Sequence, residues 1–464
     1  MKDLKKRIGN MFWLIIAFFV IMAGYFVYVA AFEAEDFIAN PFNARVRVHD
    51  ESVRRGSIYD RHGTVIAYSA QIDGAYVRQY QFGSAFAHAV GYSAMGRSGL
   101  ELSRNFSLQT MQWELVQRGN HAIFGNEILA NSVVTTLDAD LQNMIFEALG
   151  NSRGAVVAID PNTGAILAMV STPGFHPEYV EDNWVGLIND TENSPLLNRA
   201  TQGLYPPGST FKIITAAAAL HMDIDFINFE FHCEGVVVIG ENALPCWGGV
   251  AHGAVDMRRA TAVSCNGYFA VLAQEIGADA IITAAEMSLF NNAIEFELAT
   301  ATSLFNMQTD AATTELIETA IGQGRTTATP LNMAMLAAAI ANGGVAMRPY
   351  VVEGIAGSRG NTISTTVPRL AGRLVEPEIA AIIGEMLVEA VNNGTGAPAA
   401  VANMQAAGKT GTAQNETGID HSWFIGYAPA ENPTVAVAVI IENTGGGTRA
   451  SQLAGRIFAE IAAE

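Results

Sequence analysis

A serine and a lysine three residues apart stand at the start of an otherwise apolar run in the segment Gly203–Leu220, GLYPPGSTFKIITAAAAL. Residues with this spacing share one face of a helix, so the amine of Lys212 can reach the hydroxyl of Ser209. A serine beside a desolvated, neutral lysine is an activated nucleophile, because burial lowers the pKa of a lysine from its usual value of about 10.4. The pair predicts nucleophilic catalysis, although a serine at a helix start is more often only an N-cap.

Two further motifs favour catalysis over capping. The run Ser264–Asn266 reads Ser-Cys-Asn, and the run Lys409–Thr412 reads Lys-Thr-Gly-Thr. In chain order the three motifs match the Ser-x-x-Lys, Ser-Asp-Asn and Lys-Thr-Gly set of penicillin-binding proteins and class A β-lactamases, with Cys265 in place of the aspartate. The sequence therefore resembles a class B penicillin-binding protein, a monofunctional peptidoglycan D,D-transpeptidase.

The resemblance extends over nearly the whole chain. RRGSIYDRHGTVIA (residues 54–67) resembles the N-terminal module motif of that family, with His62 where asparagine is usual. Four other stretches are typical of the transpeptidase domain: GAVVAIDPNTGAILAMVSTPGF, SPLLNRATQGLYPPGSTFK, IGQGRTTATPLNMAMLAAAIANGG and HSWFIGYAP. The resemblance implies an α+β fold, in which a serine β-lactamase-like transpeptidase domain packs an antiparallel sheet against helices. A transmembrane helix and a small β-rich pedestal module would precede that domain.

The resemblance also implies a role for each motif residue. Ser209 would attack the carbonyl between the last two D-alanines of a peptidoglycan stem peptide, and Lys212 would take its proton. Ser264 would relay that proton to the leaving amine. The residues implied to bind substrate are Asn266, Lys409, Thr410, Gly411 and Thr412. The backbone N–H groups of Ser209 and Thr412 would form an oxyanion hole, which contributes about 3 kcal/mol per donor in comparable sites.

The N-terminus predicts a membrane anchor. Basic residues in segment 1–7 precede an uncharged run over residues 8–32, which is long enough to cross a hydrocarbon core of ~30 Å. Positive charge before the span and acid after it place the N-terminus in the cytoplasm and the catalytic domain outside. A cleaved signal peptide is the alternative. The formal net charge of −19 argues against nucleic acid as a partner.

The rest of the chain divides into a pedestal over residues 33–131 and a transpeptidase domain over residues 132–464. We expect hairpins at 54–67 and 154–173, and a helix over 135–149 with Asp138 as its N-cap. Helical patterns dominate residues 211–342. Two strands and a closing amphipathic helix follow, in SWFIGYAP, TVAVAVIIEN and SQLAGRIFAEIAAE.

Partners and alternatives follow from the same resemblance. The expected ligands are stem peptides and β-lactams, and the expected membrane partner is a SEDS-type glycosyltransferase. A β-lactamase, a penicillin-binding sensor and a catalytically idle cell-wall scaffold are the rival functions. No cofactor is implied, and no spaced metal motif is evident. Cys233 and Cys246 are compatible with either a disulfide or two buried thiols, whereas Cys265 is expected to be free.

Overall fold

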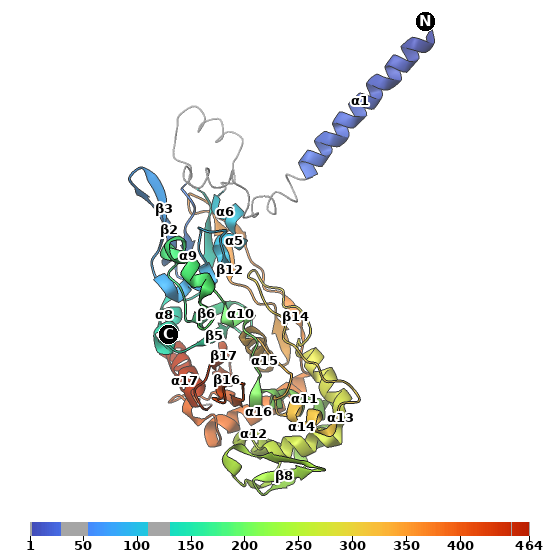
Figure 1. The fold of residues 1–464 in the computed structure, drawn as a ribbon, viewed down its shortest axis with the longest axis vertical. Coiled ribbons are helices and arrows are strands. Elements are labelled where there is room, and N and C mark those ends of the chain that lie inside the picture. The colour runs from blue at the N-terminus through green and yellow to red at the C-terminus, as the bar shows by residue number, and fades with distance from the viewer. Residues whose placement is uncertain (1, 29–53, 110–129, 447, 464) are drawn as a thin grey trace.

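The computed structural model describes residues 2–28, 54–109, 130–446 and 448–463 (Figure 1). Its first helix, α1 (Lys2–Tyr28), is apolar and exposed from Lys6 onwards, and it is long enough to cross a membrane. The predicted anchor over residues 8–32 coincides with this helix as far as residue 28, and its remainder lies outside the described residues. A second helix of sufficient length, α13 (Asn266–Met287), is half buried in the protein interior and belongs to the core.

A five-stranded antiparallel sheet forms the centre of the catalytic half, with the strand order β15-β16-β17-β5-β6. In chain order these strands are β5 (Gly154–Ile159), β6 (Ile166–Thr172), β15 (Ala407–Ala413), β16 (His421–Ala428) and β17 (Val435–Ile441). The predicted hairpin at 154–173 and the two late strands are confirmed. The α+β class with an antiparallel sheet against helices is confirmed as well.

Helices cover both faces of this sheet. Val156 and Ala158 of β5 pack on one face with α8 (Ala139–Leu149) and α17 (Thr448–Ala463), which lie side by side in Figure 1. Alternate β5 residues face the other way, against the core that contains α15 (Pro330–Ala341). This alternation is the period-two pattern of a strand, and it leaves the central strands buried on both faces.

The N-terminal half of α8 shows why its start was predictable. The Asp138 side chain accepts hydrogen bonds from the backbone N–H groups of Asp140 and Leu141 at 3.0 Å each, so it satisfies donors that the helix itself leaves unpaired. The same carboxylate lies 3.0 Å from Nε2 of His62 in the turn of the N-terminal hairpin. The predicted N-cap is confirmed, and it also joins the two halves of the chain.

Helices dominate residues 211–342, as expected, but they do not fill this range. The helices there are α11 (Lys212–Met222), α12 (Met257–Val263), α13, α14 (Thr313–Ala320) and α15. Residues 231–255 instead form two small two-stranded sheets, β7 (Phe231–Cys233) with β10 (Gly253–Val255) and β8 (Val236–Ile239) with β9 (Asn242–Pro245). The helical prediction was wrong for this segment, because Gly235 and Gly240 adopt positive φ and turn the chain back on itself.

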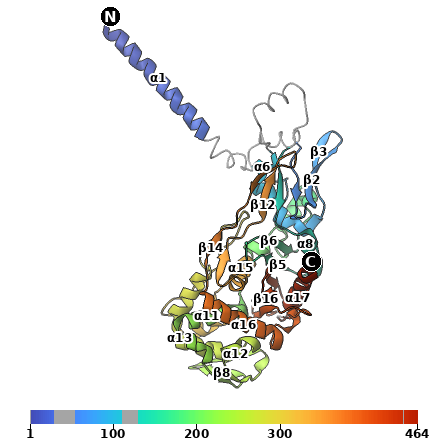
Figure 2. The same ribbon diagram turned by 180° about the vertical axis from the view of Figure 1, so that it is seen from behind.

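A six-stranded sheet lies at the opposite end of the elongated molecule from β8 (Figures 1 and 2). Its order is β13-β12-β4-β1-β2-β3, where β1 is Ile58–Tyr59, β2 is Val65–Ile72, β3 is Ala75–Tyr80, β4 is Ser132–Thr135, β12 is Val352–Ala356 and β13 is Thr362–Thr365. The hairpin predicted at 54–67 is confirmed as β1 and β2. Strands β12 and β13 come from the C-terminal half, so the pedestal boundary at residue 131 stays a prediction. The pedestal residues 33–53 and 110–129 lie outside the described residues.

Candidate active site

Ser209 lies in a tight 3₁₀ turn, Gly208–Phe211, that leads directly into α11. Gly208 has φ of 54°, and a Cβ at this position would come within 2.6 Å of the Thr412 carbonyl oxygen, so only glycine fits. Its N–H donates to Gly322 O at 2.9 Å, and the Thr210 hydroxyl donates to Pro207 O at 2.7 Å. These contacts hold Ser209 beside strand β15.

Lys212 is fully buried one turn after Ser209. Its Nζ donates to Asn266 Oδ1 at 2.6 Å, and to the carbonyl and hydroxyl oxygens of Ser264 at 2.9 Å and 3.3 Å. Among the described residues no hydrogen bond joins Lys212 to the Ser209 hydroxyl. Burial lowers the pKa of Lys212 to about 8, against a smaller opposing effect of Cys265 and Cys246. The amine is therefore much closer to its neutral form at physiological pH than an exposed lysine is.

Lys409 approaches Ser264 from strand β15. Its Nζ donates to the Ser264 hydroxyl oxygen and to Thr410 O, each at 2.9 Å, and the side chain is fully buried. Burial, and then the charge of Lys212, hold the pKa of Lys409 well below its usual value. The hydroxyl of Ser264 thus lies between two buried amines, which can pass a proton through it.

Helix ends position Ser264 and Asn266. Ser264 closes α12 in the left-handed conformation, with φ of 58°, and Asn266 begins α13. Cys265 between them is fully buried, and its Sγ accepts the backbone N–H of Tyr268 at 3.4 Å. Asn266 Nδ2 donates to Pro245 O at 2.8 Å, so its amide is fixed from both sides.

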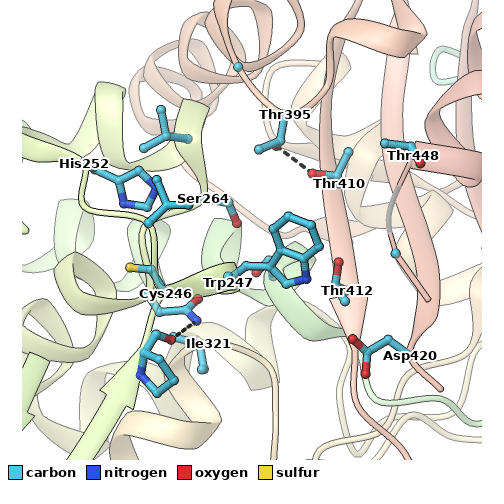
Figure 3. A pocket seen from close by; sticks show the side chains of 18 of the residues that line it. Cys246, Trp247, His252, Ser264, Ile321, Thr395, Thr410, Thr412, Asp420 and Thr448 are labelled. Atoms are coloured by element: carbon cyan, nitrogen blue, oxygen red, sulfur yellow. Dashed lines mark hydrogen bonds between the residues drawn. The ribbon is translucent and has the colours of Figure 1, made fainter. Parts of the chain in front are cut away.

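A cavity of about 770 Å³ brings the predicted residues together (Figure 3). Five of the eight predicted site residues line it: Ser209, Ser264, Asn266, Thr410 and Thr412. The two lysines lie buried next to it, bonded to Ser264. At the eighth, Gly411, a Cβ would lie 3.0 Å from Pro207 O, so glycine lets the strand pack closely against the serine turn. Strand β15 is the edge of its sheet on this side.

Sequence reasoning also left out other residues of the cavity wall, and three of them stand out. The Trp247 side chain is 70% exposed and extends into the cavity opposite Thr410 and Thr412 (Figure 3). Thr395 shares a hydrogen bond of 2.7 Å with Thr410, and Gln323 Nε2 donates to Thr412 O at 3.3 Å. Gln323 lies in a quoted stretch that is typical of the family, whereas Trp247 and Thr395 carry no signal by type or spacing.

The three cysteines are free and buried. Sγ of Cys233 and Sγ of Cys246 are 3.6 Å apart, whereas a disulfide bond is about 2.05 Å long. The sequence left open a disulfide or two buried thiols for Cys233 and Cys246, and the structure has two buried thiols. Cys265 is free, as expected, and its Sγ lies 3.8 Å from that of Cys246.

The chain is similar to known proteins over most of its length. Residues 154–463 match the family described as the penicillin binding protein transpeptidase domain, and residues 55–135 match the penicillin binding protein A dimerisation domain. The chain is 37% identical to the peptidoglycan D,D-transpeptidase PbpA of Mycolicibacterium smegmatis over 93% of this chain and 92% of that protein.

Solved structures are similar as well. A D,D-transpeptidase domain from Eggerthella lenta superposes with a TM-score of 0.81 at 34% identity, covering 89% of this chain and 99% of that one. Penicillin-binding protein A of M. tuberculosis, as a ceftriaxone acyl-enzyme complex, superposes with a TM-score of 0.82 at 32% identity and the same coverage.

Proposed function

The chain belongs to the penicillin-binding protein transpeptidase family and is a serine-type peptidoglycan D,D-transpeptidase, and we propose that Ser209 is the residue that becomes acylated during its reaction. The observation that carries this assignment is the convergence of two buried lysine amines on the Ser264 hydroxyl beside Ser209. Such a pair offers both a proton acceptor and a proton route next to a nucleophile at the edge of a strand.

The reaction then runs in two halves. The Ser209 hydroxyl oxygen attacks the carbonyl carbon between the two terminal D-alanines, and its proton passes to neutral Lys212. The C–N bond breaks, and the proton reaches the departing D-alanine amine through Ser264. The amine of a second stem peptide next attacks the ester, restores the Ser209 hydroxyl and forms the crosslink. A β-lactam follows the first half only, because its opened ring stays attached to the serine.

Strand β15 supplies the binding track for the substrate. An edge strand can pair with an extended peptide, and Gly411 lets this strand lie close to the serine turn, so a paired peptide would pass beside Ser209. The hydroxyls of Thr410 and Thr412, with Lys409 nearby, suit the terminal carboxylate of the donor peptide. Asn266 binds the substrate amide. The N–H groups of Ser209 and Thr412 would stabilise the oxyanion, since Gly208 packs directly on Thr412 O.

The rate of acylation is expected to fall with decreasing pH below about 8. The pKa of Lys212 is lowered to about 8, so below that pH the amine is protonated and cannot accept the Ser209 proton. The second-order rate constant with a fluorescent penicillin should drop about tenfold per pH unit well below 8 and level off above it. Stopped-flow or gel-based labelling from pH 5.5 to 9.5 measures this profile. A rate that is flat across this range would contradict Lys212 as the base.

Turnover separates this enzyme from a penicillin-binding sensor or an idle scaffold. All three would form the adduct with penicillin, but only a transpeptidase releases D-alanine and joins two stem peptides. Incubation of the full-length protein with donor and acceptor peptides, followed by mass spectrometry of the products, decides between these functions.

Helix α1 supports a membrane anchor, and we propose that it crosses the membrane once with its basic N-terminus in the cytoplasm. The catalytic half would then work outside. A transpeptidase without its own polymerase must meet new glycan strands. Tethering to a SEDS-type polymerase would raise their local concentration.

A chimera tests this partnership. Residues 1–53 are replaced by an unrelated single-span anchor, which keeps every described strand of the pedestal. We expect acylation by penicillin to be unchanged, because the site is untouched, while crosslinking in cells and co-purification with a multi-span polymerase are lost. Full complementation in cells by the chimera would leave the N-terminal segment as a passive spacer.

A further inference from the structure

Four metal-ligating side chains meet beside the active site although they come from four separate segments. Cys233 ends β7, Cys246 follows β9, His252 precedes β10, and Cys265 lies between α12 and α13. The three Sγ atoms and one imidazole nitrogen all lie within 4.8 Å of one another. The segment 231–255, which broke the helical pattern, supplies three of the four. None of the four has a role in the acyl-transfer mechanism above.

Three of the six distances between these atoms match the edges of a zinc tetrahedron, and all six are within 4.8 Å. Bonds of about 2.3 Å to sulfur and about 2.05 Å to nitrogen give S···S edges of about 3.8 Å and S···N edges of about 3.6 Å. The structure has 3.6 Å and 3.8 Å between the sulfurs of Cys233–Cys246 and Cys246–Cys265, and 3.5 Å from Cys233 Sγ to His252 Nδ1. A disulfide would instead bring one sulfur pair to about 2.05 Å and leave the third thiol unmatched.

The surroundings suit thiolate ligands. All three cysteines are buried, and a backbone N–H group is directed at one of the sulfurs, because Tyr268 N donates to Cys265 Sγ at 3.4 Å. Donors of this kind orient and stabilise bound thiolates. His252 is only partly buried, so one side of the cluster opens toward the cavity and gives an ion a way in.

We propose that Cys233, Cys246, Cys265 and His252 bind one Zn²⁺ through three thiolate sulfurs and the Nδ1 atom of the imidazole. Four protein ligands of this type complete the coordination of zinc and leave no position for water, so the site is structural. Each thiol gives up its proton to solvent when the metal binds.

The metal would position the catalytic motif. Cys265 is the middle residue of the run Ser264–Asn266, so fixing its sulfur fixes the oxygens that Lys212 bonds on either side. Cys246 directly precedes Trp247, whose side chain extends into the cavity (Figure 3). One ion therefore ties the Ser264 turn to the loop on the neighbouring wall.

Metal content gives the first test, and it does not depend on the proposed function. The full-length protein, purified in detergent without a metal-affinity step, is analysed by elemental mass spectrometry, and about one zinc per chain is expected. Cys233→Ser and His252→Gln should each lose most of it. His232→Gln is the matched control, because His232 is an exposed residue of β7 outside the cluster and should keep the zinc.

Cobalt and thiol measurements use the wild-type chain, so they test the zinc site even if a variant folds poorly. Replacing zinc with Co²⁺ in the wild-type chain should give the strong visible absorption of a tetrahedral thiolate site. Titration with a mercurial should release one zinc as three thiols react. A wild-type chain that holds no zinc and takes up no cobalt would overturn the proposal, as would a thiol count of one, which means a disulfide.

Chelation gives the second test, and this part rests on the proposed function. Removing zinc should slow acylation by penicillin about tenfold to a hundredfold, because small displacements of positioning groups are that costly, and added Zn²⁺ should restore it. An unchanged rate in demonstrably zinc-free protein would overturn the positioning role. Failure of the Ser209 assignment would appear differently, as labelling at another residue with zinc content unchanged.

Discussion

Ser209→Ala is expected to abolish covalent labelling by a fluorescent penicillin, with a loss on the order of 10⁴-fold or more in the acylation rate constant. The alanine lacks the oxygen that forms the ester, so no neighbouring group can substitute for it. Among the described residues that line the cavity, the one other serine is Ser264, and its hydroxyl oxygen already accepts from two lysine amines. Gel fluorescence of the full-length protein measures the loss, and peptide mass spectrometry of the wild type locates the adduct.

The matched control for this variant is Ser107→Ala, which makes the same chemical change in α6 (Asn105–Gln109) of the N-terminal half. Its labelling should equal that of the wild type. Ser209→Ala should unfold at the same temperature as the wild type, because the side chain is only half buried and lines a cavity. Labelling that persists in Ser209→Ala would refute the assignment outright.

Lys212→Arg should lower acylation by about 10³-fold or more, whereas Lys409→Arg should lower it only about tenfold. Arginine keeps the charge but does not deprotonate, so it cannot replace a base. The proposed role of Lys409 is to supply positive charge next to the substrate carboxylate, and arginine retains that charge. Rate constants with penicillin, measured at pH 8, compare the two variants directly.

Both lysines are fully buried, so thermal unfolding of each variant must accompany the rates. The larger guanidinium destabilises both sites to a similar extent, which makes each variant the packing control of the other. The pH profile adds a readout that packing does not move: the rise toward pH 8 should persist in Lys409→Arg. Equal losses in the two variants would contradict this division of roles. A pH dependence that is lost in Lys409→Arg alone would instead make Lys409 the base.

Local signals explain what the sequence predicted well. The start of α8 depends on the Asp138 carboxylate and on backbone N–H donors two and three residues after it. A short stretch of sequence is therefore enough to predict it. The hairpin of β5 and β6 depends on the Asp-Pro-Asn-Thr-Gly turn between them. The eight motif residues could be placed in one site because the family resemblance supplies the long-range contacts that a single sequence does not state.

Features that arise from distant contacts were missed. The cysteine–histidine cluster has separations of 13, 6 and 13 residues, read from positions 233, 246, 252 and 265, and no short metal motif has that form. Thr395 reaches Thr410 only because Gly394 lets two backbones touch, with a Cβ there coming within 2.2 Å of Ala262 O. Neither contact follows from local propensity.

The six-stranded sheet has a consequence for secretion and folding. Strand β4 pairs with β1 on one side and with β12 on the other, with Ile355 opposite Val133. In the proposed topology, with the catalytic half outside, β1 to β4 would leave the membrane first, and the outer edge of β4 would stay unpaired until residues 352–356 follow. An open strand edge on a nascent chain is a site for wrong pairing. In that topology the N-terminal half would not finish folding before most of the catalytic half had crossed the membrane, and a chain arrested between the two should aggregate or be degraded.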